Sequence, residues 1–187
     1  MNLYTSDLHF GHRDILTFDH RPFRSLDEME QVMIKLWNSR VQNDDEVYIV
    51  GDLFCENEKD ECWYLRQLKG YKHLIIGNHD DKLLQNEKAM SYFETVGKLV
   101  TITDRDKEIC LSHQPQLLWD NIENGAWHIY GHVHSMLVDE YKQMRDVKNA
   151  LNAGCMINNY TPASFNELVR NNKEWKNKWA KQFISRK

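Results

Sequence analysis

Residues 127–135, WHIYGHVHS, place two histidines directly after a short apolar run and a glycine. The run is rich in aromatic and β-branched residues, which predicts a strand that ends at Gly131. Alone, the pair His132 and His134 is weak evidence for a ligand site, because histidine is also common at half-buried positions. Its weight depends on whether the same pattern recurs along the chain.

The pattern recurs at other predicted strands. Short runs rich in Val, Ile, Tyr and Leu predict strands over residues 2–6, 46–51, 73–77, 98–103, 108–113, 127–131 and 150–154. Most of these runs lead into residue types that bind metal ions: Asp7, His9, His12, Asp52, Asn78, His79, Asp80, Asp81, His113, His132 and His134. Glycine immediately precedes Asp52, Asn78 and His132, where it lets the backbone turn sharply and approach closely.

Helical patterns alternate with these strands. Helices are expected over residues 25–40, 57–69 and 82–94, and from Ser164 into the C-terminal tail. Ser25 and Glu28 form the pattern of a capping box at the start of the first helix. In the tail, apolar residues recur at three- and four-residue spacings, although Asn172 interrupts the stripe. The alternation predicts one α/β domain spanning residues 1–187.

Composition limits the class of protein. With 187 residues, 41% of them hydrophobic and 28% charged, the chain is typical of one globular domain. Its net charge of -4 provides no global basic field for nucleic acid. We recognise neither a signal peptide nor a membrane span. The four cysteines lack a CxxC motif, so we expect reduced thiols and a cytoplasmic protein, and a homo-oligomer is compatible with the sequence.

The basic C-terminal tail admits two interpretations. Its cationic residues are Lys173, Lys176, Lys178, Lys181, Arg186 and Lys187. A basic amphipathic helix can bind a membrane surface or an acidic partner. We favour a helix that packs on the core and exposes its basic face to solvent.

The polar residues at the strand ends favour a metal site. Buried carboxylates are costly unless a cation compensates them. Asp, His and Asn together suit Mn, Fe, Zn, Co or Ni better than Ca or Mg, and the absence of cysteine from the clusters argues against a structural zinc knot. Seven of these residues are candidate ligands: Asp7, His9, Asp52, Asn78, His113, His132 and His134. Seven ligands are too many for one tetrahedral ion but suit two ions that share a carboxylate.

Five motifs in a fixed order carry a resemblance to a known family. They are DLH (7–9), GD (51–52), GNHD (77–80), SHQP (112–115) and GHVH (131–134). This set resembles the calcineurin-like metallophosphoesterase superfamily. LNAGC (151–155), YTPASFNEL (160–168), RPF (21–23) and the pair Trp37 and Asn38 resemble its small bacterial and phage members.

The resemblance implies a fold and a site. The fold is a double β-sandwich flanked by helices, in four layers α/β/β/α. One metal would be held by Asp7, His9, Asp52 and His134, and the other by Asp52, Asn78, His113 and His132. His79 would act near the scissile group, and Asp80 would orient its ring.

The implied activity is hydrolysis of a phosphodiester or a small phosphorylated substrate by a hydroxide that bridges two divalent ions, preferably Mn. One alternative is a catalytically silent binding scaffold of the same fold. Another is a nuclease acting on polymeric nucleic acid, for which Trp63, Tyr64 and Trp119 could form a stacking rim.

The sequence leaves the roles of His12, Arg21 and Arg24 open. His12 could line the phosphate site or support a ligand. Arg21 and Arg24 could steer an anionic substrate, although a solvated arginine is the commoner case. Substrate choice is expected in the loops at residues 55–64 and 114–126.

Overall fold

Two four-stranded sheets form the centre of the protein, in a computed structural model that describes residues 1–57, 59–135 and 139–184. The first sheet contains β1 (Asn2–Thr5), β2 (Glu46–Ile49), β3 (Tyr71–Ile75) and β4 (Phe93–Gly97) in that order. The second contains β5 (Leu99–Asp104), β6 (Lys107–Ser112), β7 (Trp127–Tyr130) and β8 (Ala150–Asn152). The predicted α/β class is confirmed.

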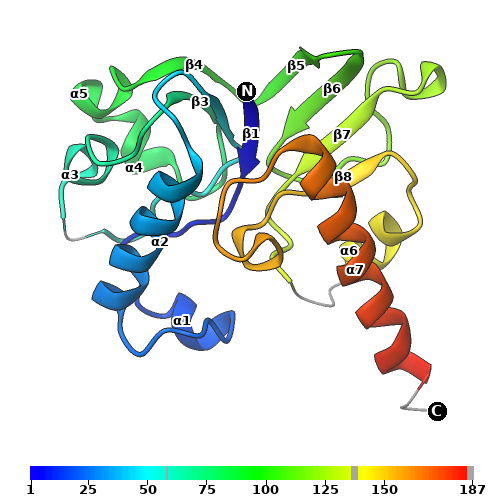
Figure 1. Cartoon of the computed structure of the whole chain (residues 1–187), viewed down its shortest axis with the longest axis horizontal. Coiled ribbons are helices and arrows are strands. Elements are labelled where there is room, and N and C mark those ends of the chain that lie inside the picture. The colour runs from blue at the N-terminus through cyan, green and yellow to red at the C-terminus, as the bar shows by residue number, and fades with distance from the viewer. Residues whose placement is uncertain (58, 136–138, 185–187) are drawn as a thin grey trace.

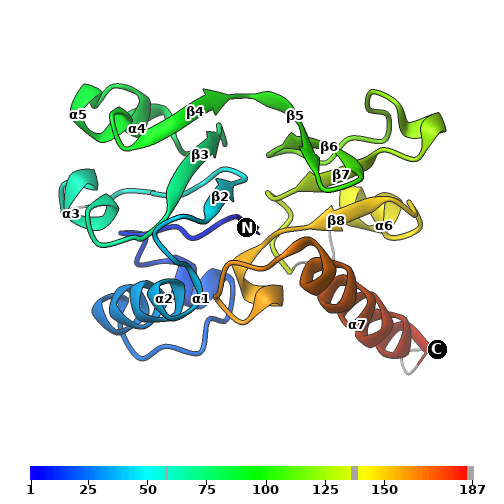
Figure 2. The same cartoon turned by 45° about the horizontal axis from the view of Figure 1, so that its top comes forward.

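Helices cover the outer sides of both sheets. They are α1 (Ile15–Phe18), α2 (Leu26–Arg40), α3 (Glu61–Leu65), α4 (Asp81–Leu84), α5 (Glu87–Met90), α6 (Asp139–Arg145) and α7 (Phe165–Ile184). Figures 1 and 2 show α2 to α5 beside the first sheet and α6 and α7 beside the second. The double sandwich in four layers α/β/β/α is therefore also confirmed.

Three apolar clusters fill the spaces between these layers. Tyr4 and Ile75 of the first sheet meet Ile109 and Ile129 of the second in the middle. The outer face of the first sheet packs on α2 and α3 through Leu3, Val47, Met29, Met33, Trp37 and Leu65. The outer face of the second packs on α6 and α7 through Cys110, Tyr130, Met144 and Trp175.

Strand direction decides where the loops gather. All neighbours in the first sheet pair in parallel, with Thr5 opposite Ile49. In the second sheet β6, β7 and β8 are parallel, and only β5 runs antiparallel to its neighbour β6. Because the carboxyl ends of parallel strands lie at one edge of a sheet, the loops after β1, β2, β3, β6 and β7 can share one site.

Helix α2 begins as predicted. The Ser25 hydroxyl oxygen accepts a hydrogen bond from the Glu28 backbone N–H at 3.2 Å. The Glu28 carboxylate accepts its hydrogen bonds from the Arg24 backbone and guanidinium, not from the Ser25 N–H as in an ideal capping box. Arg24 is exposed and paired here, in agreement with the interpretation of a solvated arginine.

The helix predicted over residues 82–94 is wrong in its second half. Helix α4 ends at Leu84, and Asn86 caps the separate short helix α5, since its side chain accepts a hydrogen bond from the Ala89 N–H. The chain then forms β4, a strand that the sequence pattern missed, which pairs with β3 and completes the first sheet. The predicted helix over residues 57–69 is also shorter, because only α3 is helical there.

Asn172 joins α7 to the second sheet. Its side chain is buried, accepting a hydrogen bond from the Asn152 N–H at 2.8 Å and donating one to the Asn152 carbonyl at 2.9 Å. Leu168 and Trp175 are also buried, so the packed face predicted for this helix is confirmed over its described part. The side chains of Lys178, Trp179, Lys181, Phe183, Arg186 and Lys187 lie outside the described residues. No helix in the described parts of the chain is long and apolar enough to cross a bilayer.

Candidate metal centre

The fold brings all seven candidate ligands to one edge of the sandwich. Asp7, His9 and His134 form a first donor group, and Asp52, His113 and His132 form a second. Within each group the ligand atoms lie within 4.8 Å of one another. Asn78 belongs to the surroundings of the second group, through its contacts with His113 and His132.

The first donor group is buried. Nε2 of His134 lies 3.6 Å from Oδ1 of Asp7. The Asp7 carboxylate accepts hydrogen bonds from the Ser6 hydroxyl at 2.7 Å and the His132 backbone N–H at 3.1 Å. His9 is only 2% exposed, yet neither of its ring nitrogens has a hydrogen-bond partner among the described residues. Such a buried, unbonded imidazole is suited to a metal ion.

A carboxylate that sequence reasoning missed holds His134. Oδ2 of Asp19 lies 2.9 Å from Nδ1 of His134, which leaves Nε2 to face Asp7. Arg21 pairs with Asp19 and donates hydrogen bonds to the carbonyls of Asp7 and Leu8. Arg21 is thus buried and not solvated as expected. Metal-binding histidines commonly donate their second N–H to a carboxylate in this way.

The second donor group is more open. Nε2 of His113 lies 3.2 Å from Oδ2 of Asp52 and 3.0 Å from Oδ1 of Asn78. Nδ1 of His113 donates to the Val50 carbonyl at 2.8 Å, which leaves Nε2 as the coordinating nitrogen. Nδ1 of His132 lies 2.9 Å from Oδ1 of Asn78, and both of these residues are exposed.

Asp52 connects the two groups. Its Oδ2 is 3.2 Å from Nε2 of His113 in the second group and 3.7 Å from Nε2 of His9 in the first. Its Oδ1 accepts the backbone N–H of His79 at 2.9 Å. This is the position that a carboxylate shared by two ions would need.

Backbone strain concentrates at these residues. Five of the seven candidate ligands have left-handed φ angles: Asp7 (56°), His9 (53°), Asp52 (55°), His132 (69°) and His134 (50°). Each such conformation costs about 1–3 kcal/mol and persists only where the surroundings enforce it. The loops are therefore shaped for the positions of the side chains and not for local backbone preference.

The three glycines singled out in the sequence provide close approach. A Cβ atom added to Gly51 would lie 2.2 Å from Nδ1 of His113, and one added to Gly77 would lie 2.2 Å from Oδ1 of Asp52. A Cβ on Gly131 would lie 1.9 Å from the Ser6 hydroxyl oxygen. The side chain of any other residue would displace a candidate ligand or its partner, which confirms the predicted role of these glycines.

Charge interactions outweigh burial in setting the pKa values of Asp52 and His113. Burial alone would raise the pKa of Asp52 and lower that of His113. Their mutual hydrogen bond and opposite charges outweigh burial, so the pKa of Asp52 falls to about 2 and that of His113 rises to about 9. Burial and the charge of His134 lower the pKa of His9 to about 2. His9 is therefore neutral, and a divalent ion would replace the proton on His113.

The hydrogen bonds of the Asp80 carboxylate go to backbone N–H groups and not to the His79 ring, so the prediction that Asp80 orients this ring is corrected. Its fully buried carboxylate accepts hydrogen bonds from the backbone N–H groups of Asp52, Leu53 and Gly77. A buried carboxylate needs such donors, and the N–H groups at two loop starts supply them. Asp80 thus ties the loop after β2 to the loop after β3.

Two hollows flank the donor groups. The first, about 390 Å³, is lined by members of both groups, by His79, and by the apolar residues Ile15, Phe18 and Val133. The second, about 470 Å³, lies beyond Asn78 and His113 and is lined by Lys98, Gln114 and Gln116 among others.

The predicted aromatic rim of Trp63, Tyr64 and Trp119 is wrong in part. Tyr64 and Trp119 are buried, and they bond to the Glu30 carboxylate and the Ala126 carbonyl. The exposed aromatic side chain at the first hollow is Phe18, which is 57% exposed. Sequence reasoning missed Phe18 because α1 is only four residues long and shows no repeating apolar pattern.

Comparison with known proteins adds the family. The sequence model of the calcineurin-like phosphoesterase family matches residues 3–108, more than half of the chain. The protein belongs to this family. The chain is 30% identical to the uncharacterized protein MJ1445 of Methanocaldococcus jannaschii over 167 residues, 88% of this chain and 87% of the relative. It is 27% identical over 178 residues to the gene 66 protein of Mycobacterium phage L5, covering 80% and 86% of the two chains.

A solved structure shares the fold. The crystal structure of AQ665 from Aquifex aeolicus, described as a protein of unknown function, superimposes with a TM-score of 0.71 at 26% identity and covers 91% of this chain and 98% of that one. The family match ends at residue 108, before His113, His132 and His134. In this member of the family the second sheet brings these three histidines to the residues of the matched region.

Proposed function

We propose that the protein is a dinuclear metal-dependent phosphoesterase. The observation that carries this proposal is the pair of donor groups that meet at Asp52 beneath an open hollow. Two divalent ions at such a site suit an in-line displacement at phosphorus. Membership of the calcineurin-like phosphoesterase family supports the same reaction class.

The residues fit the ions that this function requires. Asp7, His9, Asp52 and His134 would hold one ion, and Asp52, Asn78, His113 and His132 the other. The unbonded nitrogens of His9 and the carboxylate of Asp52 between the two groups support this assignment. When bound, the ions would activate water and polarise the phosphoryl oxygens. The mixed O and N donors favour Mn²⁺, with Fe, Zn, Co and Ni as alternatives.

His79 is the proposed proton donor. Its side chain is exposed at the first hollow, while its backbone N–H is fixed by Asp52 at 2.9 Å. An imidazole held there can donate a proton to the leaving oxygen of the ester. Asp80 acts indirectly, because it fixes the backbone on both sides of the Asp52 carboxylate.

The two hollows favour a small phosphodiester as substrate. A diester has an ester arm on each side of phosphorus, and the hollows lie on either side of Asn78. Phe18 would pack against an apolar or aromatic arm, while Lys98 and Gln114 would meet a polar one. The net charge of -4 does not favour a polymeric nucleic acid. Four unpaired cysteines support a cytoplasmic location.

Hydrolysis of bis-p-nitrophenyl phosphate tests this proposal. Chelator-treated protein is titrated with Mn²⁺, and the rate is compared with that on the monoester p-nitrophenyl phosphate. We expect a rate that requires Mn²⁺, saturates near two equivalents and is higher on the diester. The exposed residue Asp106 offers a matched control, since Asp106→Asn should keep the rate that Asp52→Asn loses. Stoichiometric metal binding without hydrolysis of any diester would instead indicate a silent scaffold.

A further inference from the structure

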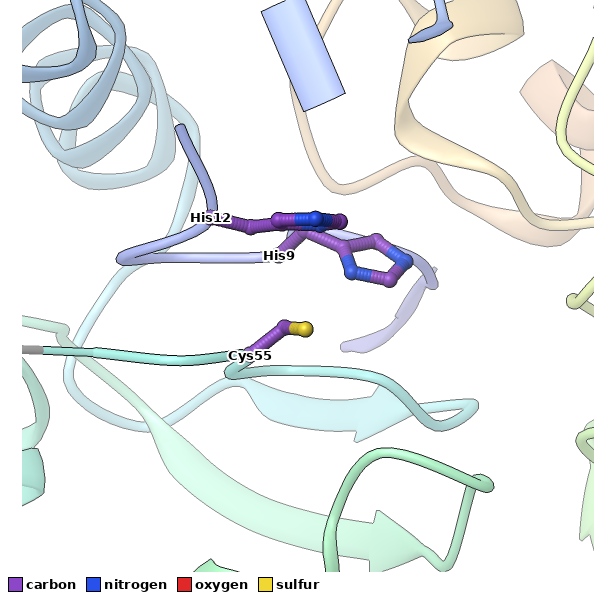
Figure 3. Close-up of side chains that lie close together, drawn as sticks. All are labelled: His9, His12 and Cys55. Carbon is purple, nitrogen blue, oxygen red and sulfur yellow. The ribbon is translucent and has the colours of Figure 1, made fainter. Parts of the chain in front are cut away.

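A third cluster of ligand types lies beside the first donor group. Figure 3 shows the side chains of His9, His12 and Cys55 lying close together. One ligand atom from each lies within 4.8 Å of the others. The proposed dinuclear centre uses neither His12 nor Cys55, so this cluster needs its own explanation.

The backbone brings the three residues together from two loops. Phe10 and Phe54 form a parallel bridge between the loop after β1 and the loop after β2. Cys55 N–H donates to the Phe10 carbonyl at 3.1 Å, which sets the thiol against His9 and His12. The contact is thus built into the fold and does not depend on a mobile side chain at the surface.

Unsatisfied nitrogens point to a ligand at this cluster. His9 has no hydrogen-bond partner at either ring nitrogen, and Nδ1 of His12 has none either, among the residues that the structure describes. Nε2 of His9 faces Asp52. In Figure 3 one nitrogen of the His9 ring lies on the side of Cys55 and the other points away. His9 therefore presents a nitrogen to each of two neighbouring sites.

We propose that His9, His12 and Cys55 form an alternative site for a soft divalent cation such as Zn²⁺, whose occupation excludes an ion from the first donor group. A sulfur and two imidazoles are a zinc-type donor set, unlike the oxygen-containing set of the dinuclear centre. Nδ1 of His79 lies 3.5 Å from the Cys55 sulfur, so this ring is the candidate for a fourth donor. Binding releases the thiol proton to solvent, since the thiolate is the ligand.

Exclusion follows from the chemistry of imidazole. A neutral ring has one nitrogen lone pair, and its other nitrogen carries a proton. An ion on Nε2 of His9 places this proton on the nitrogen that faces Cys55, whereas an ion at the thiol site places it on Nε2. A thiolate is a soft ligand, so a hard ion such as Mn²⁺ is poorly suited to the thiol site, which selects softer ions.

Cadmium binding tests the site without any reference to activity. Chelator-treated full-length protein is titrated with Cd²⁺, a soft probe whose bond to a thiolate gives an ultraviolet charge-transfer band. We expect the band in the wild type and in Cys62→Ser, a control at a cysteine of similar burial, and its loss in Cys55→Ser. Because His134→Ala weakens the competing first donor group, the band should form at a lower Cd²⁺ concentration in that variant. A wild type without the band, or a Cys55→Ser variant that keeps it, would overturn the proposal.

Inhibition tests the exclusion, and this part rests on the proposed function. Zn²⁺ should inhibit the Mn²⁺-supported hydrolysis of bis-p-nitrophenyl phosphate. Half-inhibition in Cys55→Ser should need at least about tenfold more Zn²⁺ than in Cys62→Ser. Loss of a residue that only supports a metal ligand already weakens metal binding by about tenfold, and loss of a ligand should weaken it at least as much. Equal inhibition of the two variants would contradict exclusion. If the wild type hydrolyses no ester, the dinuclear function fails, while the cadmium band still decides whether the thiol site exists.

Discussion

The first donor group is enclosed by protein, whereas the second opens to solvent. Asp7, His9 and His134 are 0%, 2% and 5% exposed, but His132 of the second group is exposed, as is Asn78 beside it. The first group is also held from behind, by Asp19 on His134. We infer that the first group is organised for tight metal binding and that the second is where substrate meets metal.

Loss of the Asp52 carboxylate should impair both donor groups at once, because Asp52 contacts His9 in the first group and His113 in the second. Asp52→Asn keeps the shape of the side chain and removes its charge. We expect a fall of about 10³-fold in kcat/KM on a diester, equivalent to about 4 kcal/mol of transition-state stabilisation. The measurement is the steady-state rate at saturating Mn²⁺. A rate within tenfold of that of the Asp106→Asn control would refute a shared carboxylate.

The stability of the metal-free protein should depend on pH because His113 of the second group titrates. The folded state raises the pKa of His113 to about 9, so its stabilisation is complete below the unfolded value near 6.5 and is lost as pH rises through 9. We expect the free energy of unfolding to fall by about 3 kcal/mol between pH 6 and pH 10. Urea unfolding of chelator-treated protein measures this. His113→Gln serves as the comparison, and an equal fall in that variant would show that His113 is not its source.

Asp19→Asn should weaken the first group alone. The amide can still contact Nδ1 of His134 but no longer carries the charge that the imidazole needs. We expect the tighter of two Mn²⁺ affinities to fall by about 10–100-fold, with the weaker one unchanged. Calorimetric titration separates the two affinities. An equal loss at both would mean that Asp19 supports the whole edge of the sandwich and not one ion.

Phe18→Ala should leave the nitrogen contacts of both donor groups in place, since Asp19 still holds Nδ1 of His134. Phe18 is 57% exposed at the first hollow, where its ring meets the His134 ring edge-on with centroids 6.0 Å apart, so its loss removes apolar contact with a substrate arm. We expect KM for an aromatic diester to rise about fivefold, equivalent to about 1 kcal/mol, with kcat and Mn²⁺ affinity unchanged. Leu118→Ala, at another exposed apolar residue, provides the control. A fall in kcat with unchanged KM would place Phe18 in the chemical step instead.

The sequence predicted candidate ligands well where each ligand directly follows the strand that positions it. Strand ends, their glycines and the candidate ligands could be recognised because each signal lies within a few residues. Asp19 could not, since it acts on His134 across 115 positions. Asp80 was assigned to its neighbour His79, but a buried carboxylate bonds to whichever N–H groups the fold supplies.

Secondary structure failed where local preference was weak. The helical pattern reads on to residue 94, yet α5 ends at Met90 and β4 begins at Phe93, because the edge of the first sheet offers β3 as a partner. Cys55 gave no signal because its relation to His9 and His12 depends on the bridge between Phe10 and Phe54. In both cases the deciding contact is distant in sequence.

Electron paramagnetic resonance of the Mn²⁺-loaded protein tests the central claim most directly, because two ions that share Asp52 must be magnetically coupled. At two equivalents of Mn²⁺ we expect the multiline spectrum of a coupled pair, with half the hyperfine splitting of an isolated ion, and its loss in Asp52→Asn. A wild-type spectrum made only of isolated, uncoupled Mn²⁺ would contradict a dinuclear centre at this edge of the sandwich.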